Sequence, residues 1–570
     1  MRPFILTNLQ AGKLPRWGLP LLCLLYALPG MIGRDPWRTA DATGFGISLT
    51  MARGGPHDWL MPNIFGDPVY DDSPFPYWIA AIAIRALPFF AEHPVVRGVT
   101  VASMLILFAS VWYATYRVAR LPGVQPSDPF GASVSRIDFG RAIADSALLV
   151  LLATIGLIAR VHETTADAGQ VALIGVFLFG AAVAIDTPRR GAWLAGLAAG
   201  ASLPSGGPQV WVPLFVVLVS LPWLIPAHRL VRSRFWASAL PPALIVAAAW
   251  PLALVLVGPE GREYLERWWQ GNLSLTIGPA LENARYLVST IPWFFWPAWP
   301  MVAWSLWRWR TRLSEPAVGL PLLCIAALLI PALLSPRSGE SLLLPMIPPM
   351  AMLAAVGLPT IKRAAVSLVD WFSVTTFTLM GLTIWAYWIA WVTGFPPVMA
   401  FKAGQLAPGF RPSGILDEIV LGLLATAAWL LLVRWRVSRQ PRMIWRAVML
   451  ASCGLVLMWF LLMTLWLTMF NERNTYRDVG LAVGQHRGRN DDCVGSRHLN
   501  PTARTSIAYF GNVRFGPEQS CPWLVIEDQG PLAGVIAPQE AGYRLVWEGS
   551  RRRGRDERFR MYQRIAPAPR

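Results

Sequence analysis

The sequence predicts a mainly helical, polytopic membrane protein with about thirteen spans and a small α/β domain at its C-terminal end. Of the 570 residues, 54% are hydrophobic and only 15% are charged, whereas an average soluble domain carries about 25% charged residues. Long apolar runs follow one another to about residue 470, and they are too long for barrel strands. We therefore divide the chain into a transmembrane domain, 1–470, and a polar tail domain, 471–570.

Each predicted span is an apolar run bounded by charged residues, proline or glycine. A helix needs about 20 residues to cross the hydrocarbon, so the short run 191–204 is the weakest of the set. A further run, 75–91, is flanked by proline and interrupted by Arg85. The thirteen runs are 18–33, 97–117, 141–160, 168–186, 191–204, 209–226, 236–257, 290–307, 318–335, 341–358, 371–393, 415–434 and 445–470.

Arginine clusters between the runs predict the orientation and account for the net charge of +17. If the N-terminus is cytoplasmic and 75–91 does not cross, nearly all clusters fall inside, as the positive-inside rule requires. We therefore expect 75–91 to lie on the outer surface and no nucleic-acid partner. The clusters are Arg117/Arg120/Arg136, Arg189/Arg190, Arg229/Arg232/Arg234, Arg308/Arg310/Arg312, Lys362/Arg363 and Arg434/Arg436/Arg439/Arg442.

This topology puts the first loop, 34–96, the loop 258–289 and the tail on the outer face, which in a bacterial inner membrane is the periplasm. The tail carries short β-like runs at 506–510 and 523–527. Its two cysteines, Cys493 and Cys521, can pair if the tail faces an oxidising compartment; two unpaired thiols are the alternative. No cleavable signal is expected, because 18–33 begins the bundle.

Two acidic positions on the outer face are candidates for chemistry. Asp41 follows the first span, where a carboxylate can act as a general base. Asp167 opens a later span and can cap the helix that follows. Since both lie on one side of the membrane, they can converge at one site. Solvated loop charges or helix caps are the alternative reading of such aspartates.

The first loop carries three motifs in a recognisable order. Residues 40–43 read Ala-Asp-Ala-Thr where a known family has Pro-Asp-Glu-Thr, and 58–62 contain its Asp-Trp-Leu followed by Pro. Residues 66–78 follow its run Gly-x-Pro-Tyr-Phe-Glu-Lys-Pro-Pro-x-x-Tyr-Trp, and Asp167 stands at its second acidic position. The tail segment 503–511 looks like the start of its periplasmic domain.

A later segment, 335–351, is similar to the same family's Ser-x-x-Lys-Leu-x-x-Tyr-x-Leu-Pro run. Together the motifs resemble the GT-C glycosyltransferases, above all the bacterial ArnT-like aminoarabinose transferases that modify lipid A, and their protein O-mannosyltransferase relatives. The resemblance covers most of the chain and implies transfer of a sugar from a polyprenyl-phosphate carrier to an acceptor on the outer face. The acceptor it implies is a lipid, a glycan or a protein.

The resemblance also assigns roles to residues. Asp41 is the expected catalytic base, and Asp167 is expected to support the site or to help hold a divalent metal, the one cofactor left open. The expected substrate loop comprises Asp71, Asp72, Tyr77 and Asn272.

The chain departs from the family where lysines are expected. The family's donor-binding Lys falls at Asp72, and its Leu-Thr-Lys-Gly-Pro motif becomes Leu-Pro-Ser-Gly-Gly-Pro at 203–208. With three lysines in the whole chain, arginine must supply the phosphate contacts, for which its forked guanidinium is suited. The candidates are Arg262, Arg267, Arg285 and Arg337; headgroup-facing or solvated charges are the alternative.

Three other functions stay open from the sequence. The lost lysines favour a non-catalytic homologue, which the retained Asp41 and Asp167 oppose. A transporter of lipid-linked glycans needs charged residues inside several spans, and these spans have few. A glycan polymerase needs arginine-rich outer loops, and 258–289 offers only part of that pattern.

Overall fold

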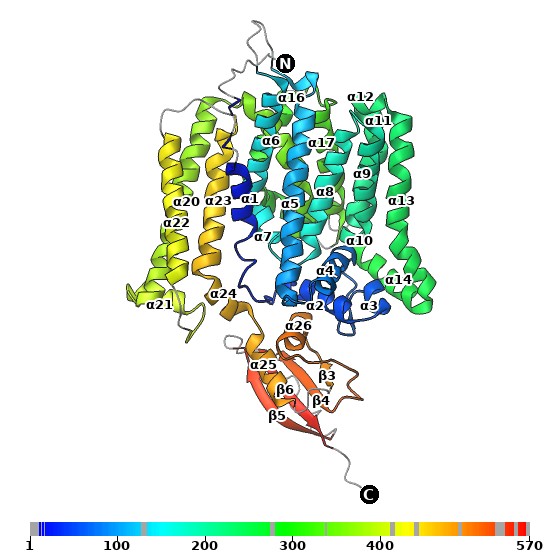
Figure 1. The fold of residues 1–570 in the computed structure, drawn as a ribbon, viewed down its shortest axis with the longest axis vertical. Helices are drawn as coiled ribbons and strands as arrows, with labels where there is room; N and C mark the ends of the chain where they lie inside the picture. The colour runs from blue at the N-terminus through cyan, green and yellow to red at the C-terminus, as the bar shows by residue number, and fades with distance from the viewer. Residues whose placement is uncertain are drawn as a thin grey trace.

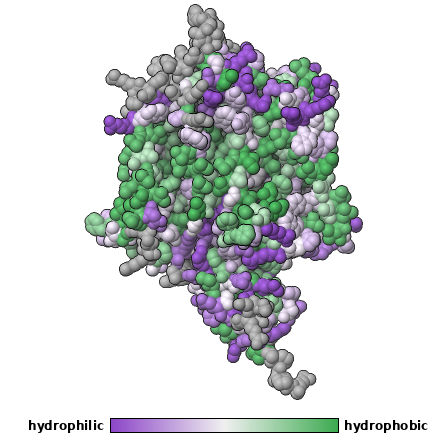
Figure 2. Space-filling view, in the orientation of Figure 1, coloured by the Kyte–Doolittle hydropathy of each residue, from purple (hydrophilic) through white to green (hydrophobic). Residues whose placement is uncertain are grey.

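A computed structural model shows a helical bundle with a small sheet domain beneath one end (Figure 1). It describes residues 11–12, 14–15, 17–126, 134–273, 280–336, 339–410, 416–437, 444–487, 493–529, 542–551 and 557–565. On the face shown in Figure 2, apolar residues form a belt across the bundle, and polar residues gather at its two ends and on the sheet domain. Among the described residues, eight helices are long and apolar enough to cross a membrane. The chain is therefore a multi-pass membrane protein.

Every run that the sequence predicts as a span contains a helix of the bundle. Several of these helices, such as α1, α9 and α16, are shorter than their neighbours. The helices are α1 (Gly18–Ala27), α5 (Glu92–Ala119), α6 (Arg136–Ala153), α8 (Ala166–Val183), α9 (Pro188–Ala201), α11 (Pro208–Leu224), α13 (Arg232–Val257), α16 (Ala298–Trp309), α17 (Pro316–Leu334), α19 (Ile347–Gly357), α20 (Arg363–Thr393), α22 (Leu416–Val437) and α23 (Arg446–Leu465).

Short helices collect at the end of the bundle that faces the sheet domain (Figure 1). The run 75–91 forms α4, which has 12 residues and is too short to cross the hydrocarbon, in keeping with its predicted place on the surface. The short elements here are α2 (Ala40–Arg53), α3 (Pro56–Leu60), β1 (Asn63–Ile64), β2 (Asp67–Pro68), α4 (Phe75–Ala86), α7 (Ile155–Arg160), α10 (Leu203–Gly206), α14 (Pro259–Leu273) and α15 (Ala280–Phe294).

The described residues of the segment 258–289 are largely helical, not the loop that the sequence predicts. In α14, Tyr264 and Trp268 lie one helical turn apart and are both buried, so this helix has the apolar face that packing requires. The span predicted at 290–307 begins earlier, within α15, and is divided because Pro297 precedes α16. Proline lacks the N–H that a continuous helix needs.

The tail contains a four-stranded mixed sheet in the order β3-β4-β6-β5, with β3 parallel to β4 and the other pairs antiparallel. Its own core includes Val483, Ile507, Val525 and Phe559. The prediction of a small α/β domain is therefore confirmed. Its elements are α24 (Leu467–Asn474), α25 (Arg477–His486), β3 (Val494–Arg497), α26 (Pro501–Phe510), β4 (Trp523–Gln529), β5 (Tyr543–Ser550) and β6 (Glu557–Arg564).

The prediction of a strand is wrong for one of the two β-like runs of the tail. Residues 523–527 lie in β4, but 506–510 form the second half of α26. The side chain of Asn500 accepts a hydrogen bond from the Ala503 N–H, and Pro501 occupies the first turn; both features start helices. Ala503 and Ile507, four residues apart, are fully buried, so the apolar spacing has the helical period.

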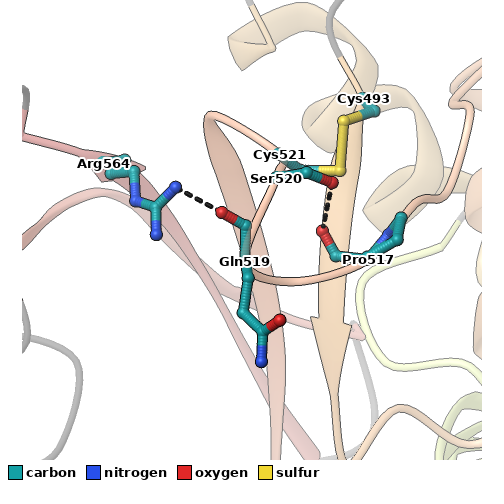
Figure 3. Close-up of a disulfide and its surroundings, with 6 residues drawn as sticks. All are labelled: Cys493, Pro517, Gln519, Ser520, Cys521 and Arg564. Carbon is teal, nitrogen blue, oxygen red and sulfur yellow. Dashed lines mark hydrogen bonds between the residues drawn. A yellow bond between two sulfur atoms is a disulfide. The ribbon is translucent and has the colours of Figure 1, made fainter.

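A disulfide joins Cys493, just before β3, to Cys521, just before β4 (Figure 3). Beside it, the Ser520 hydroxyl donates a hydrogen bond to the carbonyl of Pro517, and Arg564 of β6 donates to the carbonyl of Gln519. The bridge therefore holds the entrances of two neighbouring strands together.

The tail domain docks on α2 through α26. The Thr505 side chain lies so close to Gly46 that a Cβ there would come within 2.1 Å of its hydroxyl oxygen. Tyr509 packs edge-on against Phe45 at 5.0 Å between ring centroids, and Arg504 donates a 2.7 Å hydrogen bond to the carbonyl of Phe65. The first outer segment is thus enclosed between bundle and tail.

Candidate functional site

The two predicted aspartates open two helices in the same way. The tripeptide Thr-Ala-Asp occurs at 39–41 and again at 165–167. In each copy the threonine is the N-cap and its hydroxyl accepts a 3.3 Å hydrogen bond from the N–H of the aspartate. The cap of α8 is therefore Thr165, not Asp167 as the sequence analysis expects. This repeat is a signal in the sequence that both carboxylates are positioned by helix starts.

Asp41 is completely buried among cations. Its Oδ2 lies 2.8 Å from Nη2 of Arg97 and 3.3 Å from Nη2 of Arg34, and it accepts a 3.2 Å hydrogen bond from the Trp37 N–H. Both guanidinium groups are themselves buried, with side chains 2% exposed. Asp41 thereby ties α2 to α5 and to the segment after α1.

The other carboxylate oxygen of Asp41, Oδ1, accepts hydrogen bonds from Thr164. The Thr164 N–H donates to Oδ1 at 2.8 Å, and the Thr164 hydroxyl lies 2.9 Å from Oδ1 and 2.7 Å from the Asp41 carbonyl. Burial alone raises the pKa of Asp41, but Arg34, Arg97 and the Thr164 N–H outweigh it and hold that pKa well below its usual range. The carboxylate is ionised and fully engaged.

Asp167 lies on the other side of the same turn and has one cationic partner. Arg160, the last residue of α7, donates to Asp167 Oδ2 from Nε at 3.1 Å and from Nη2 at 2.9 Å. This pair is less enclosed than Asp41, with side chains 27% and 11% exposed. Since Thr164 and Thr165 are adjacent, Asp41 and Asp167 do converge on one turn.

Tyr77 links Asp72 to the start of α8. The Tyr77 hydroxyl donates a hydrogen bond to Asp72 and accepts one from the Ala166 N–H at the start of α8. Burial, then the charges of Asp167 and Asp71, raise the pKa of Asp72 to about 6, although the bond from Tyr77 opposes the rise. We call Asp72, Tyr77 and Asp167 the carboxylate cluster.

A glycine turn lies against the loop that carries the cluster. Gly207, between α10 and α11, has a φ of +68°, and a Cβ there would lie 3.2 Å from Oδ1 of Asn272. Asn272 donates a 3.1 Å hydrogen bond to the Tyr70 carbonyl, and Asp71 lies beside Gly271. The structure therefore brings Asp71 and Asn272, two of the expected substrate-loop residues, together around Tyr70 and Gly271.

The four candidate arginines do not form one cationic site in the described part of the chain. Arg267 donates a 3.0 Å hydrogen bond to the Tyr70 hydroxyl and pairs with Glu263. Arg262 and Arg285 are exposed on α14 and α15, and Arg337 lies outside the described residues. The cation at the carboxylate cluster is Arg160, which the sequence analysis does not single out.

Arg97, the partner of Asp41, is a second residue of this site that is absent from the candidates expected from the sequence. It lies at the start of a predicted span, and a charge next to an apolar run is itself a signal of a buried partner. Arg34 and Thr164 give no comparable signal, because nothing in their local sequence identifies Asp41 as their partner. Among the described residues, no group of three or more His, Cys, Asp or Glu side chains is placed to hold a metal ion.

Comparison with known proteins gives one curated relative and a matching fold. No known family description matches the chain. An undecaprenyl phosphate-alpha-4-amino-4-deoxy-L-arabinose arabinosyl transferase from Aeromonas salmonicida is 26% identical over 367 residues. That alignment spans 60% of this chain and 60% of the relative, so it covers less than two thirds of the relative's length.

The solved structures of ArnT from Cupriavidus metallidurans superimpose on almost the whole chain. The structure with bound undecaprenyl phosphate gives a TM-score of 0.64 at 14% identity and covers 96% of this chain and 97% of ArnT. The apo structure gives 0.65 at 13%, with 95% and 96% covered. The chain therefore has the fold of these ArnT structures, as the motifs imply.

Proposed function

We propose that this protein is a membrane glycosyltransferase that moves a sugar from a polyprenyl-phosphate carrier to a lipid, glycan or protein acceptor. The supporting observations are the fold shared with ArnT and the arabinosyl transferase relative. The observation that carries the proposal to this chain is the carboxylate cluster. Its Tyr77 and Asp167 lie in the first turns of α4 and α8, at the end of the bundle that faces the tail domain (Figure 1). Carrier-linked sugars present their reactive carbon at such a membrane boundary.

In this proposal Asp72 is the general base. It takes the proton of the acceptor hydroxyl or amine as the acceptor atom bonds to the anomeric carbon, and the bond from that carbon to the carrier phosphate breaks. A base is most effective when its pKa lies near the working pH, and the pKa of Asp72 is about 6. Arg160, which pairs with Asp167, would contact the donor phosphate.

Asp41 has a positioning role in this proposal, in place of the base role that the sequence analysis expects. A base needs a free acceptor position, and both oxygens of Asp41 are engaged by Thr164, Arg97 and Arg34. Asp41 keeps the turn at 164–165 in place, and that turn carries Asp167.

The topology belongs to the same proposal. The chain would have thirteen spans, a cytoplasmic N-terminus and a periplasmic tail in a bacterial inner membrane, with the transmembrane domain at 1–470 and the tail domain at 471–570. Arg262, Arg267, Arg285 and Arg337 remain candidates for contacts with the donor phosphate, and Asp71 and Asn272 for contacts with substrate.

The test measures the rate of sugar transfer by the purified protein reconstituted into membranes. Undecaprenyl phosphate-linked aminoarabinose is the donor probe. Asp72→Asn should lower the rate by about 10²–10⁴-fold, the usual contribution of a general base, and Asp167→Asn should lower it less. Asp67→Asn, in the same loop, is the matched control. Parental transfer by Asp72→Asn would remove Asp72 as the base.

A non-catalytic homologue is the second candidate, because Asp72 stands where the family has a donor-binding Lys. The same assay separates the two. A protein that binds undecaprenyl phosphate and transfers no sugar from a panel of carrier-linked donors would be non-catalytic, and the carboxylate cluster would then serve binding alone.

A further inference from the structure

A groove runs between α9 and α13 on the side of the bundle, away from the carboxylate cluster. It encloses about 650 Å³ and its lining includes Trp193, Leu197, Ala237, Ser238 and Ile245. Trp193 is 55% exposed and Ile245 is 68% exposed. In a membrane protein, apolar side chains this open on a spanning helix face lipid.

The backbones of α9 and α13 approach closely beside the groove. A Cβ at Gly196 would lie 2.1 Å from the carbonyl oxygen of Ala239, and one at Gly200 would lie 2.8 Å from that of Ala243. Glycine at these positions lets the backbones touch. The contact fixes the spacing of α9 and α13, so the groove is a permanent part of the fold.

The groove also contains polar backbone. Pro241 and Pro242 lie inside α13 and line the groove, and neither has an N–H to donate to the carbonyl four residues earlier. Those carbonyls belong to Ala237 and Ser238, which line it too. A carbonyl that lacks its usual helical donor is poorly suited to hydrocarbon, so this part of the groove suits the hydrated headgroup and glycerol region of a lipid better than acyl chains alone.

One end of the groove is strongly basic. Arg189 and Arg190, in the first turn of α9, are both exposed and line it. In the part of the chain that the structure describes, no ion pair involves either of them, and the nearby Asp186 pairs with Arg117 at 3.1 Å. The first turn of α13, packed beside them, adds Arg232 and no acidic residue. The positive charge is therefore uncompensated.

We propose that this groove binds one anionic phospholipid, with its phosphate on Arg189 and Arg190 and its chains along Leu197 and Ile245. Arginine binds phosphate oxygens through two parallel N–H groups, and Trp193 has the amphipathic ring that favours the headgroup level. The site lies at the end of the bundle opposite the tail domain (Figure 1), so it is independent of the proposed transfer reaction.

Native mass spectrometry of the purified full chain tests the site. The protein is mixed with phosphatidylglycerol or phosphatidylcholine of equal chain length, and the retained lipid is counted. We expect retention of one phosphatidylglycerol, at least about tenfold more than of phosphatidylcholine. Inorganic phosphate at millimolar concentration should not displace it, because the groove also binds the chains; displacement would identify a simple phosphate site and overturn the lipid proposal.

Two variants localise the lipid. Arg189→Gln with Arg190→Gln should abolish the preference for phosphatidylglycerol. The matched control, Arg229→Gln with Arg234→Gln, removes two exposed charges, one at the end of the short helix α12 (Pro226–Arg229) and one in the first turn of α13, and should keep the preference. Ala237→Trp fills the groove and should release both lipids. Equal loss of preference in the test and control pairs, or no loss in either, would overturn the proposal.

Discussion

Thr164 and Asp41 are joined by three contacts between 2.7 and 2.9 Å, although 123 residues separate them in the chain. Through these contacts the first turn of α2 holds the segment that starts α8. The turn at 164–165 then orients Asp167. Asp41 and Asp167 are therefore linked through this turn, but their surroundings differ. One is locked between arginines, and the other lies in the carboxylate cluster.

Asp41→Asn should destabilise the protein. The change leaves Arg34 and Arg97 buried without a carboxylate, and breaking a buried ion pair in this way typically costs about 3–5 kcal/mol. Thermal unfolding in detergent measures the effect. Asp186→Asn, which breaks the exposed pair with Arg117, is the control and should cost less than about 1 kcal/mol. Unchanged stability together with lost transfer would return Asp41 to the base role.

The transfer rate should rise with pH through about 6. The pKa of Asp72 is raised to about 6, so below that pH the carboxyl is mostly protonated and is too weak a base to take the acceptor proton. The rate should level off above pH 7, and the acid limb should vanish in Asp72→Asn. A pH–rate profile with a limb near 4 would show that an unperturbed carboxylate is the base.

Tyr77→Phe should move that acid limb to higher pH. The Tyr77 hydroxyl stabilises the ionised form of Asp72 by donating a hydrogen bond, which lowers the pKa of Asp72. Without this bond, burial and the neighbouring carboxylates raise it further. The aromatic ring is kept, so folding should be preserved. A limb that stays at the parental pH would mean that Tyr77 does not act on Asp72.

Gly44→Ala should disrupt the turn that carries Asp167. A Cβ at Gly44 would lie 1.9 Å from the carbonyl oxygen of Thr164, and backbone cannot move aside as a side chain can. We expect a loss of about 1–3 kcal/mol, typical of overpacking, and reduced transfer. Gly55→Ala is the control, because nothing lies within 4 Å of its Cβ. Equal unfolding temperatures for the two variants would contradict the packing.

Mass spectrometry without reduction should find Cys493 and Cys521 joined in protein purified from membranes. Replacing both with serine should destabilise the tail by about 3 kcal/mol in the chain-entropy model for a loop of this length. Cys23, buried in α1, serves as the internal control and should be free. Two free thiols in the tail would remove the bridge and the argument that this domain faces an oxidising compartment.

Several features follow from local sequence alone. The spans are readable because a helix must satisfy its backbone internally to cross hydrocarbon, so each leaves a long apolar run. The tail is readable as a separate unit because its composition changes at about residue 470. Asp41 and Asp167 are recognisable as candidates because carboxylates beside apolar runs stand out against so few charges, whereas Asp72 is a candidate only through the family resemblance.

Only the tertiary structure decides what each carboxylate can do. Thr164, Arg97 and Arg34 reach Asp41 from three separate segments, and Tyr77 and Asp167 reach Asp72 from two others. A carboxyl's pKa depends on burial and on charges within a few ångströms, and these distances are set by helix packing. The residue that local sequence favours as the base is therefore the one that the fold locks in an ion pair, while the aspartate that replaces a family lysine has the environment of a base.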